Sequence, residues 1–100
     1  MIDLPTMDAI RDAAVRLGEQ YGIDSMYLFG SYAKGTADQN SDIDLRIDRG
    51  QIKSLIRLAG LHIALEEALG TAVDLLPTDS LDERFLQRIK PEEVLLYARQ

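Results

Sequence analysis

The chain has 100 residues, of which 46% are hydrophobic and 28% charged, and it contains no cysteine and no tryptophan. This length fits one domain over residues 1–100, the apolar share excludes a disordered chain, and the lack of cysteine excludes disulfide bridges, cysteine-ligated zinc and thiol catalysis. Eleven Lys and Arg against seventeen Asp and Glu give a net charge of −6, so the chain lacks the broad positive field that holds nucleic acid by phosphate neutralisation alone.

The sequence also lacks the marks of a membrane or secreted protein. No apolar run approaches the ~20 residues that span a bilayer, and the first residues lack the basic and apolar regions of a signal peptide. We therefore expect a cytoplasmic protein that has no contact with a membrane.

The first predicted elements are a helix over residues 6–21 and a strand over 25–29. Apolar residues recur in the helix at spacings of three and four, which indicates one buried stripe: Ile10, Ala13, Ala14, Leu17 and Tyr21. Thr6 can cap the start of this helix and Gly22 can end it. The strand is short, apolar and partly aromatic, which is typical of a buried strand.

A polar loop over residues 31–41 leads into a second strand. Its composition of Gly, Thr, Asp, Gln, Asn and Ser is typical of a loop. Apolar and polar residues then alternate, which predicts a half-buried strand. Its apolar face carries Ile43, Leu45 and Ile47, and its polar face carries Asp42, Asp44, Arg46 and Asp48.

The remaining elements complete an α/β fold, a small mixed sheet of three main strands covered by helices, because strands alternate with helices. They are a helix over 51–69 ended by Gly70, a strand over 72–76 stopped by Pro77, a helix over 81–89 capped by Ser80, and a short tail over 91–100.

The helix over 51–69 carries two apolar stripes on almost opposite sides, although a surface helix needs only one. One stripe is Ile52, Leu55, Ile56, Ala59 and Ile63, and the other is Leu58, Leu61, Leu65, Ala68 and Leu69. Either the helix over 81–89 covers the outer stripe, or the outer stripe docks another protein chain. We place Leu61 and Leu65 at the centre of that outer stripe.

One group of residues carries the chemistry. Gly30 and Ser31 end the first strand, and after ten intervening residues Asp42 and Asp44 open the second strand on the same face. Two neighbouring carboxylates repel each other unless a cation such as Mg²⁺ lies between them. Asp74 lies within an apolar strand, where a buried carboxylate must be paired or bound to metal.

The glycine and serine provide the other half of this group. Gly30 has no side chain, so a phosphate can approach the backbone closely, and Ser31 can open a helical turn whose N–H groups donate to an anion. A phosphate site facing three carboxylates is what metal-assisted nucleotidyl transfer requires. Alternate aspartates alone could form a solvent-facing edge, but the full combination favours a site.

Three further residues have open roles. Arg46 can contact a phosphate or pair with a neighbouring carboxylate, and we favour the pair. Lys34 can reach a phosphate or remain solvated. His62, the single histidine, is expected at the surface or at the boundary of the core.

Two segments carry a resemblance to a known family. Residues 30–35 (Gly-Ser-Tyr-Ala-Lys-Gly) and 41–45 (Ser-Asp-Ile-Asp-Leu) resemble the nucleotidyltransferase superfamily typified by DNA polymerase beta. They look most like its minimal nucleotidyltransferase (MNT) proteins, and the resemblance covers about residues 10–97. It implies a nucleotidyltransferase palm fold.

The resemblance also implies site residues and cofactors. Three aspartates would be catalytic and would ligate Mg²⁺, expected as two ions: Asp42, Asp44 and Asp74. Gly30, Ser31 and Lys34 would bind the nucleotide, with ATP as substrate. The family usually has Arg where this chain has Lys34, which keeps the charge but loses the planar fork of a bidentate contact.

Stand-alone MNT proteins are commonly antitoxins paired with a HEPN-domain toxin, to which they transfer AMP from ATP on a tyrosine. The resemblance therefore implies a Mg²⁺-dependent protein adenylyltransferase that acts as an antitoxin within a hetero-oligomer. Two alternatives stay open, namely a non-catalytic antitoxin that neutralises its toxin by binding, and a small transferase acting on RNA or a metabolite. The acidic charge disfavours RNA.

Overall fold

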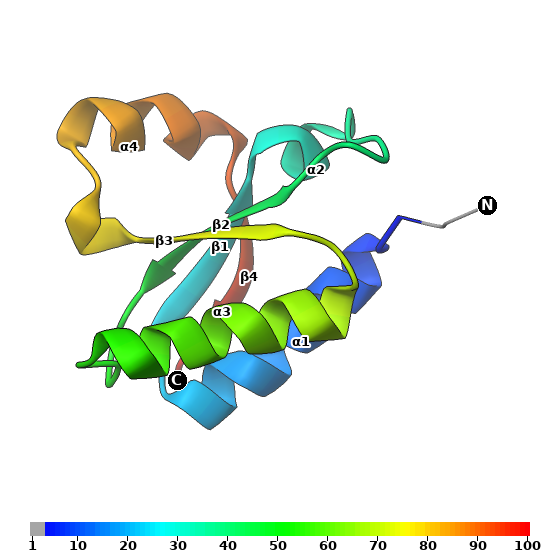
Figure 1. Ribbon diagram of the computed structural model, residues 1–100. Coiled ribbons are helices and arrows are strands. Elements are labelled where there is room, and N and C mark those ends of the chain that lie inside the picture. Colours follow the sequence, from blue (N-terminus) through cyan, green and yellow to red (C-terminus); the bar gives the residue numbers. More distant parts are fainter. Residues whose placement is uncertain (1–3) are drawn as a thin grey trace.

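The computed structural model describes residues 4–100, which form one mixed sheet and the helices that cover it (Figure 1). The elements in chain order are α1 (Met7–Tyr21), β1 (Ser25–Phe29), α2 (Gly30–Lys34), β2 (Ile43–Asp48), α3 (Leu55–Leu69), β3 (Val73–Pro77), the 3₁₀ turn η1 (Thr78–Ser80), α4 (Glu83–Ile89), the 3₁₀ turn η2 (Lys90–Glu92) and β4 (Val94–Ala98). The strand order is β3-β2-β1-β4. β1 pairs antiparallel with β2 and β4, whereas β2 and β3 run parallel.

One face of the sheet packs against the hydrophobic core. α1 and α3 lie side by side against that face, and α4 lies on the opposite side of the sheet (Figure 1). The apolar side chains of β2 that alternate toward the helices are fully buried: Ile43, Leu45 and Ile47. The predicted α1 stripe is confirmed, since its first four residues are buried and Tyr21 packs against the core.

The predicted limits of α1 are confirmed. The hydroxyl of Thr6 accepts a hydrogen bond from the Ala9 N–H at 3.1 Å, and Gly22 ends the helix in the left-handed region at φ 72°. The chain can then turn directly into β1, which starts at Ser25.

α3 corrects the expectation about the outer apolar stripe. Leu61 and Leu65 are fully buried in the core, so the placement of these two residues on an outer docking stripe was wrong. The opposite stripe is the exposed one, with Leu55 at 80%, Ile56 at 87% and Ile63 at 56% exposure. Periodicity reveals two stripes, but only the packing of α3 against α1 and β3 decides which of them faces inward.

Two boundaries also differ from the expectation. α3 begins at Leu55 rather than near residue 51, because Ser54 caps it by accepting from the Arg57 N–H at 3.1 Å. α4 is capped by Asp82, which accepts from the Phe85 N–H at 2.8 Å. Ser80 is instead the last residue of η1.

The expected tail contains a fourth strand. β4 pairs with the free edge of β1, and its residues Leu96 and Tyr97 are buried. Tyr97 packs onto α1 at Gly18, where an added Cβ would lie 2.7 Å from the ring. None of the helices within residues 4–100 has the length and apolar character that a membrane crossing requires.

Candidate functional site

Two carboxylates from neighbouring strands meet at the centre of the candidate site. β2 and β3 pair in parallel with Asp44 opposite Asp74, and these two side chains lie within hydrogen-bond reach of each other. Asp42 directly precedes β2, and its carboxylate is close enough to contribute to the raised pKa of Asp44. The structure therefore brings Asp44 and Asp74 side by side, with Asp42 near them at the start of β2.

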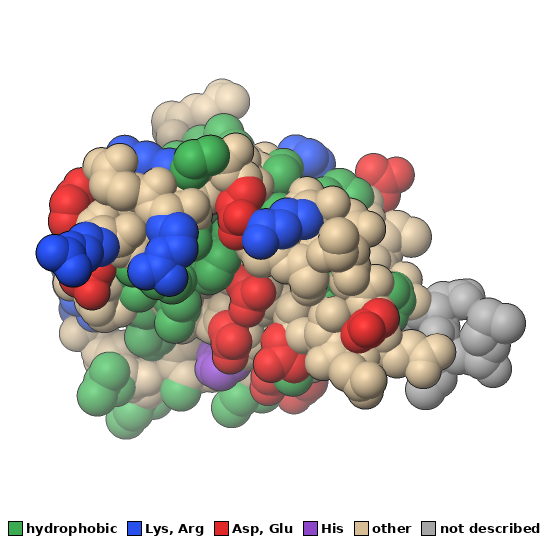
Figure 2. All heavy atoms as spheres, turned by 90° about the horizontal axis from the view of Figure 1, so that it is seen from above, with side chains coloured by type: hydrophobic (Ala, Val, Ile, Leu, Met, Phe, Trp, Pro, Cys, Tyr) green, Lys and Arg blue, Asp and Glu red, His purple; other side chains and the backbone are tan. Residues whose placement is uncertain are grey.

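Negative charge is crowded around Asp44. Burial, followed by the neighbouring carboxylates of Asp74, Asp42 and Glu92, raises the pKa of Asp44 from 3.8 to about 6. Like charges at close range disfavour the ionised form of each other, and burial disfavours it further. Seen from above, acidic side chains gather in the middle of the molecule, with basic side chains beside them (Figure 2).

Asp74 corrects the expectation of a buried strand. β3 is an edge strand, and within it only Val73 is buried, whereas Asp74 is exposed. An exposed carboxylate does not need a partner to be tolerated. Its position opposite Asp44, rather than its burial, is therefore the observation that connects Asp74 with the site.

Gly30 lies directly beside Asp44 of this carboxylate pair. Its φ is 74°, and a Cβ at this position would lie 2.1 Å from Asp44 Oδ2. The left-handed conformation and the close approach of the carboxylate both require glycine. Ser31 follows as the second residue of α2 and is half-buried, so the predicted helical turn at this residue is confirmed.

A further carboxylate, which the sequence analysis missed, closes the site. Glu92 in η2 accepts a hydrogen bond from the Gly30 N–H at 3.1 Å through Oε1, and its Oε2 lies 3.2 Å from Lys34 Nζ. The Gly30 N–H and then Lys34 lower the pKa of Glu92. A separation of 62 positions in the chain hid this contact, and the pair Glu92-Glu93 directly before the apolar run over 94–98 was its only signal.

Arg46 pairs with carboxylates, as the favoured interpretation predicted. Its Nε and Nη2 donate to Glu93 at 2.5 and 2.9 Å, its Nη1 donates to Thr78 at 2.8 Å, and its guanidinium lies 4.1 Å from the centre of the Tyr27 ring. Both side chains of the pair are buried, with Arg46 8% and Glu93 7% exposed. Arg46 therefore fixes the segment that carries Glu92.

His62 has the boundary position that was expected. Its Nε2 lies 2.5 Å from the Val73 carbonyl oxygen, and Glu66, one turn later on α3, accepts from the Val73 N–H at 2.9 Å. The two side chains thus hold both backbone groups of the residue that precedes Asp74. They connect α3 with the acidic end of β3.

The chemistry of the acidic side chains fits a hard divalent cation. Mg²⁺ prefers oxygen ligands and one or two carboxylates with room for water and phosphate, and Asp44 and Asp74 present such oxygens side by side. Burial and then the neighbouring carboxylates raise the pKa of Asp44, and a bound cation would offset the charge of those carboxylates. Among residues 4–100, however, no three acidic or histidine side chains are already arranged as a closed metal site.

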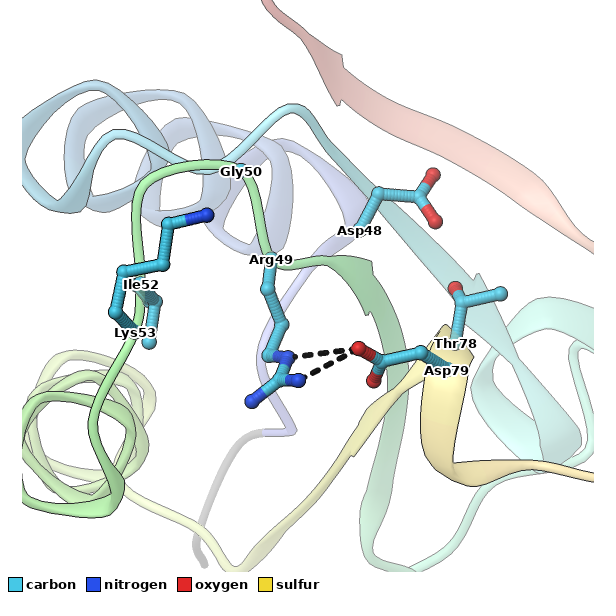
Figure 3. A pocket seen from close by; sticks show the side chains of 7 residues that line it. All are labelled: Asp48, Arg49, Gly50, Ile52, Lys53, Thr78 and Asp79. Atoms are coloured by element: carbon cyan, nitrogen blue, oxygen red, sulfur yellow. Dashed lines mark hydrogen bonds and ion pairs between the residues drawn. The ribbon is translucent and has the colours of Figure 1, made fainter.

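A cavity of about 360 Å³ lies at the other end of β2 (Figure 3). Asp48, Arg49 and Asp79 line it, and Arg49 donates to Asp79 Oδ2 through Nε and Nη2 at 3.1 and 2.6 Å. Asp48 follows Asp44 by four positions, which is about 13 Å along a strand. The cavity is therefore separate from the carboxylate pair.

Comparisons with known proteins agree with this geometry. Residues 14–100 match the family described as polymerase beta, nucleotidyltransferase. The protein adenylyltransferase MntA of Thermococcus cleftensis is 34% identical over 95 residues, which are 94% of this chain and 96% of that protein.

Solved structures share the fold. A chain of a crystal structure of a toxin–antitoxin with AMP-PNP superimposes with a TM-score of 0.76 at 28% identity, over 90% of this chain and 74% of that one. A structure of a tri-AMPylated Shewanella oneidensis HEPN toxin in complex with MNT antitoxin matches with a TM-score of 0.72, over 95% of this chain and 75% of that one. The identity to the second is 23%, so that likeness concerns the fold alone.

Proposed function

The chain belongs to the polymerase beta nucleotidyltransferase family, and on this premise we propose that it transfers AMP from ATP to a tyrosine hydroxyl of a partner HEPN toxin and thereby acts as an antitoxin. The curated relative is a protein adenylyltransferase. Chains with the same fold occur in a toxin–antitoxin with AMP-PNP and in a complex with an AMPylated HEPN toxin. The adenylyltransferase relative supports the reaction, and the toxin–antitoxin with AMP-PNP supports the nucleotide and a toxin as partner.

The observation that carries the proposal is the close approach of Gly30 to Asp44, which lies opposite Asp74 in the sheet. Gly30, with the Ser31 hydroxyl next along the chain, would supply the donors, and the adjoining Asp44 carboxylate, whose pKa is raised by burial and by its acidic neighbours, would supply the acidic group. Nucleotidyl transfer needs these two kinds of group at one point, because phosphate oxygens must be held while charge develops at the reacting phosphorus.

We assign metal binding to the aspartates. Asp42 and Asp44 would hold the ion that accompanies the triphosphate, and Asp74 would complete the site near the attacking oxygen. Bound Mg²⁺ would neutralise the triphosphate, polarise the α-phosphorus and favour the deprotonation of the attacking hydroxyl.

The phosphate side of the site belongs to Gly30, Ser31 and Lys34. Their backbone N–H, hydroxyl and ammonium groups would hold the β- and γ-phosphates. In the transfer, the tyrosine oxygen forms a bond to the α-phosphorus and loses its proton, while the bond from the α-phosphorus to the bridging oxygen breaks. Pyrophosphate leaves, and the groups that hold the β- and γ-phosphates stabilise its charge.

The experiment incubates the chain with α-labelled ATP, Mg²⁺ and a HEPN toxin partner, and follows the label on the toxin. We expect labelling by the wild type, loss of labelling in Asp42→Asn and Asp44→Asn, and wild-type labelling in Asp12→Asn, which changes an exposed carboxylate of α1. Each substitution at the site removes one charge from the acidic group.

The alternatives give different results in the same experiment. A toxin that is neutralised by the wild type and by Asp44→Asn, without label, would identify an antitoxin that acts by binding. Label on RNA or on a small molecule but not on the toxin would identify the other kind of transferase. Wild-type labelling of the toxin by Asp44→Asn would contradict the assigned site.

A further inference from the structure

One side chain binds two of the donor groups that we assigned to the triphosphate. The Gly30 N–H and Lys34 Nζ are bound by the two oxygens of a single carboxylate, that of Glu92, at 3.1 and 3.2 Å. A carboxylate presents two anionic oxygens to these donors as a phosphate group would. A phosphate group therefore cannot accept from both of these donors while the Glu92 carboxylate is bound to them.

Glu92 also adds negative charge at the place where the nucleotide must enter. Its carboxylate is one of the groups that raise the pKa of Asp44, so it lies close enough to act on the acidic cluster. A triphosphate carries several negative charges and is repelled by an unshielded carboxylate at this distance. The contact therefore opposes nucleotide binding by both position and charge.

The neighbouring residue keeps the backbone of this segment in place. Glu93 forms the buried two-bond pair with Arg46, and β4 begins at Val94, which pairs with Leu28 of β1. The Glu92 side chain, in contrast, is 25% exposed, and its partner Lys34 is 56% exposed. Rotation of the Glu92 side chain into solvent can thus open the site without movement of the backbone.

We propose that Glu92 is an autoinhibitory side chain, which competes with the triphosphate for Gly30 and Lys34 and must rotate away before a nucleotide binds. This inference rests on the proposed function, because it takes the same two donors as the phosphate site. The apparent dissociation constant equals the intrinsic constant divided by the open fraction, so a contact formed in nine of ten molecules weakens binding about tenfold.

The test compares binding of AMP-PNP and of AMP, each with Mg²⁺, by calorimetry to the wild type, Glu92→Gln and Glu92→Asp. Glu92→Asp keeps the charge but shortens the side chain by one methylene, so its carboxylate no longer reaches both donors. Glu19→Gln is the matched control, because it removes an exposed carboxylate from α1.

We expect both Glu92 variants to bind AMP-PNP about tenfold more tightly than the wild type. The affinity of these variants for AMP, and the affinity of Glu19→Gln for AMP-PNP, should equal those of the wild type. The Gly30 amide resonance of the nucleotide-free protein should shift in Glu92→Asp. Tighter binding in Glu92→Gln but not in Glu92→Asp would mean that charge alone acts, and it would overturn the inference. Equal or weaker binding in both variants would overturn it as well.

The failure of the proposed function gives a different result. If neither the wild type nor any variant binds AMP-PNP, both the proposed function and the inference fall. If the wild type binds AMP-PNP and the Glu92 variants bind it no more tightly, only the inference falls. Circular dichroism of each variant verifies that the protein is folded.

Discussion

Gly30 meets two demands that no other residue satisfies together. Its φ of 74° lies in the left-handed region, and the Asp44 carboxylate occupies the space of a Cβ. The spacing of the motif in the sequence identified both residues as parts of one site. Their contact could not be predicted, because alternation along a strand gives the direction of a side chain and not its distance from the end of another strand.

The raised pKa of Asp44 leads to a prediction for the metal-free protein. Its pKa is about 6 in the folded state against 3.8 ordinarily, so ionisation of Asp44 costs stability as the pH rises from about 4 to about 6, and the whole cost is present above that range. Asp44→Asn removes the cost. We expect the variant to melt at a higher temperature than the wild type near pH 7.5 in EDTA, with the difference shrinking toward about pH 4.

Thermal unfolding of the two proteins at several pH values measures this difference. Asp12→Asn is the control, since its carboxylate is exposed. A difference between Asp44→Asn and the wild type that is the same at all pH values would contradict the prediction.

Ser31 offers a second prediction at the scale of one residue. Ser31→Ala removes one hydroxyl but keeps the backbone donors of α2, and a hydrogen bond to a charged group contributes about 1.5–3 kcal/mol. We expect weaker AMP-PNP binding in the presence of Mg²⁺ and a smaller loss of transfer than in Asp44→Asn. Calorimetry checks the affinity, with Ser80→Ala in η1 as control, and an unchanged affinity of Ser31→Ala would remove this hydroxyl from the phosphate site.

At the scale of elements, α3 supports the acidic edge of the sheet. Its inner face fills the core with Leu61 and Leu65, and its residues His62 and Glu66 hold the backbone of Val73. One helix thus contributes to stability and also fixes the strand residue next to Asp74. The sequence placed His62 correctly at a boundary, but its distance along the chain from β3 hid the contact.

The two faces of α3 give a prediction with its own control. Leu61→Glu combined with Leu65→Glu places two carboxylates in the core, and each buried, unpaired charge costs several kcal/mol against a typical stability of about 5–15 kcal/mol. We expect this double variant to lose the folded signal in circular dichroism. Leu55→Glu combined with Ile56→Glu changes two exposed residues and should remain folded; unfolding of this second pair would contradict the orientation of the helix.

At the scale of the whole molecule, the sequence predicted the α/β order and the nucleotidyltransferase family, because strand alternation, caps and the Gly30–Ser31 motif are local signals. The family is confirmed by the match over residues 14–100. The fourth strand and the role of Glu92 were missed, because both depend on pairing between segments far apart in the chain. The assignment of metal and nucleotide to individual residues remains a prediction.

The pair of Arg46 and Glu93 connects the middle of the sheet with η2 and gives a further prediction. Glu93→Gln leaves the buried guanidinium of Arg46 with only the more exposed Asp48, 3.8 Å away, as a counter-charge, and breaking a buried pair costs about 3–5 kcal/mol. We expect a lower midpoint in urea unfolding. Asp79→Asn breaks the more exposed pair with Arg49 and should lower the free energy of unfolding by at most about 1 kcal/mol. Equal losses of stability in the two variants would contradict the larger contribution that we assign to the buried pair.

The position of β4 beside β1 has a consequence for how the site is assembled in time. Gly30 and Glu92 are separated by 62 positions, so their contact closes a long loop, and pairings between distant segments are the slow steps of folding. While the ribosome synthesises the chain, β1, Gly30 and Lys34 emerge well before Glu92 exists. The contact that covers these donors therefore belongs to the final stage of folding, when β4 joins the sheet.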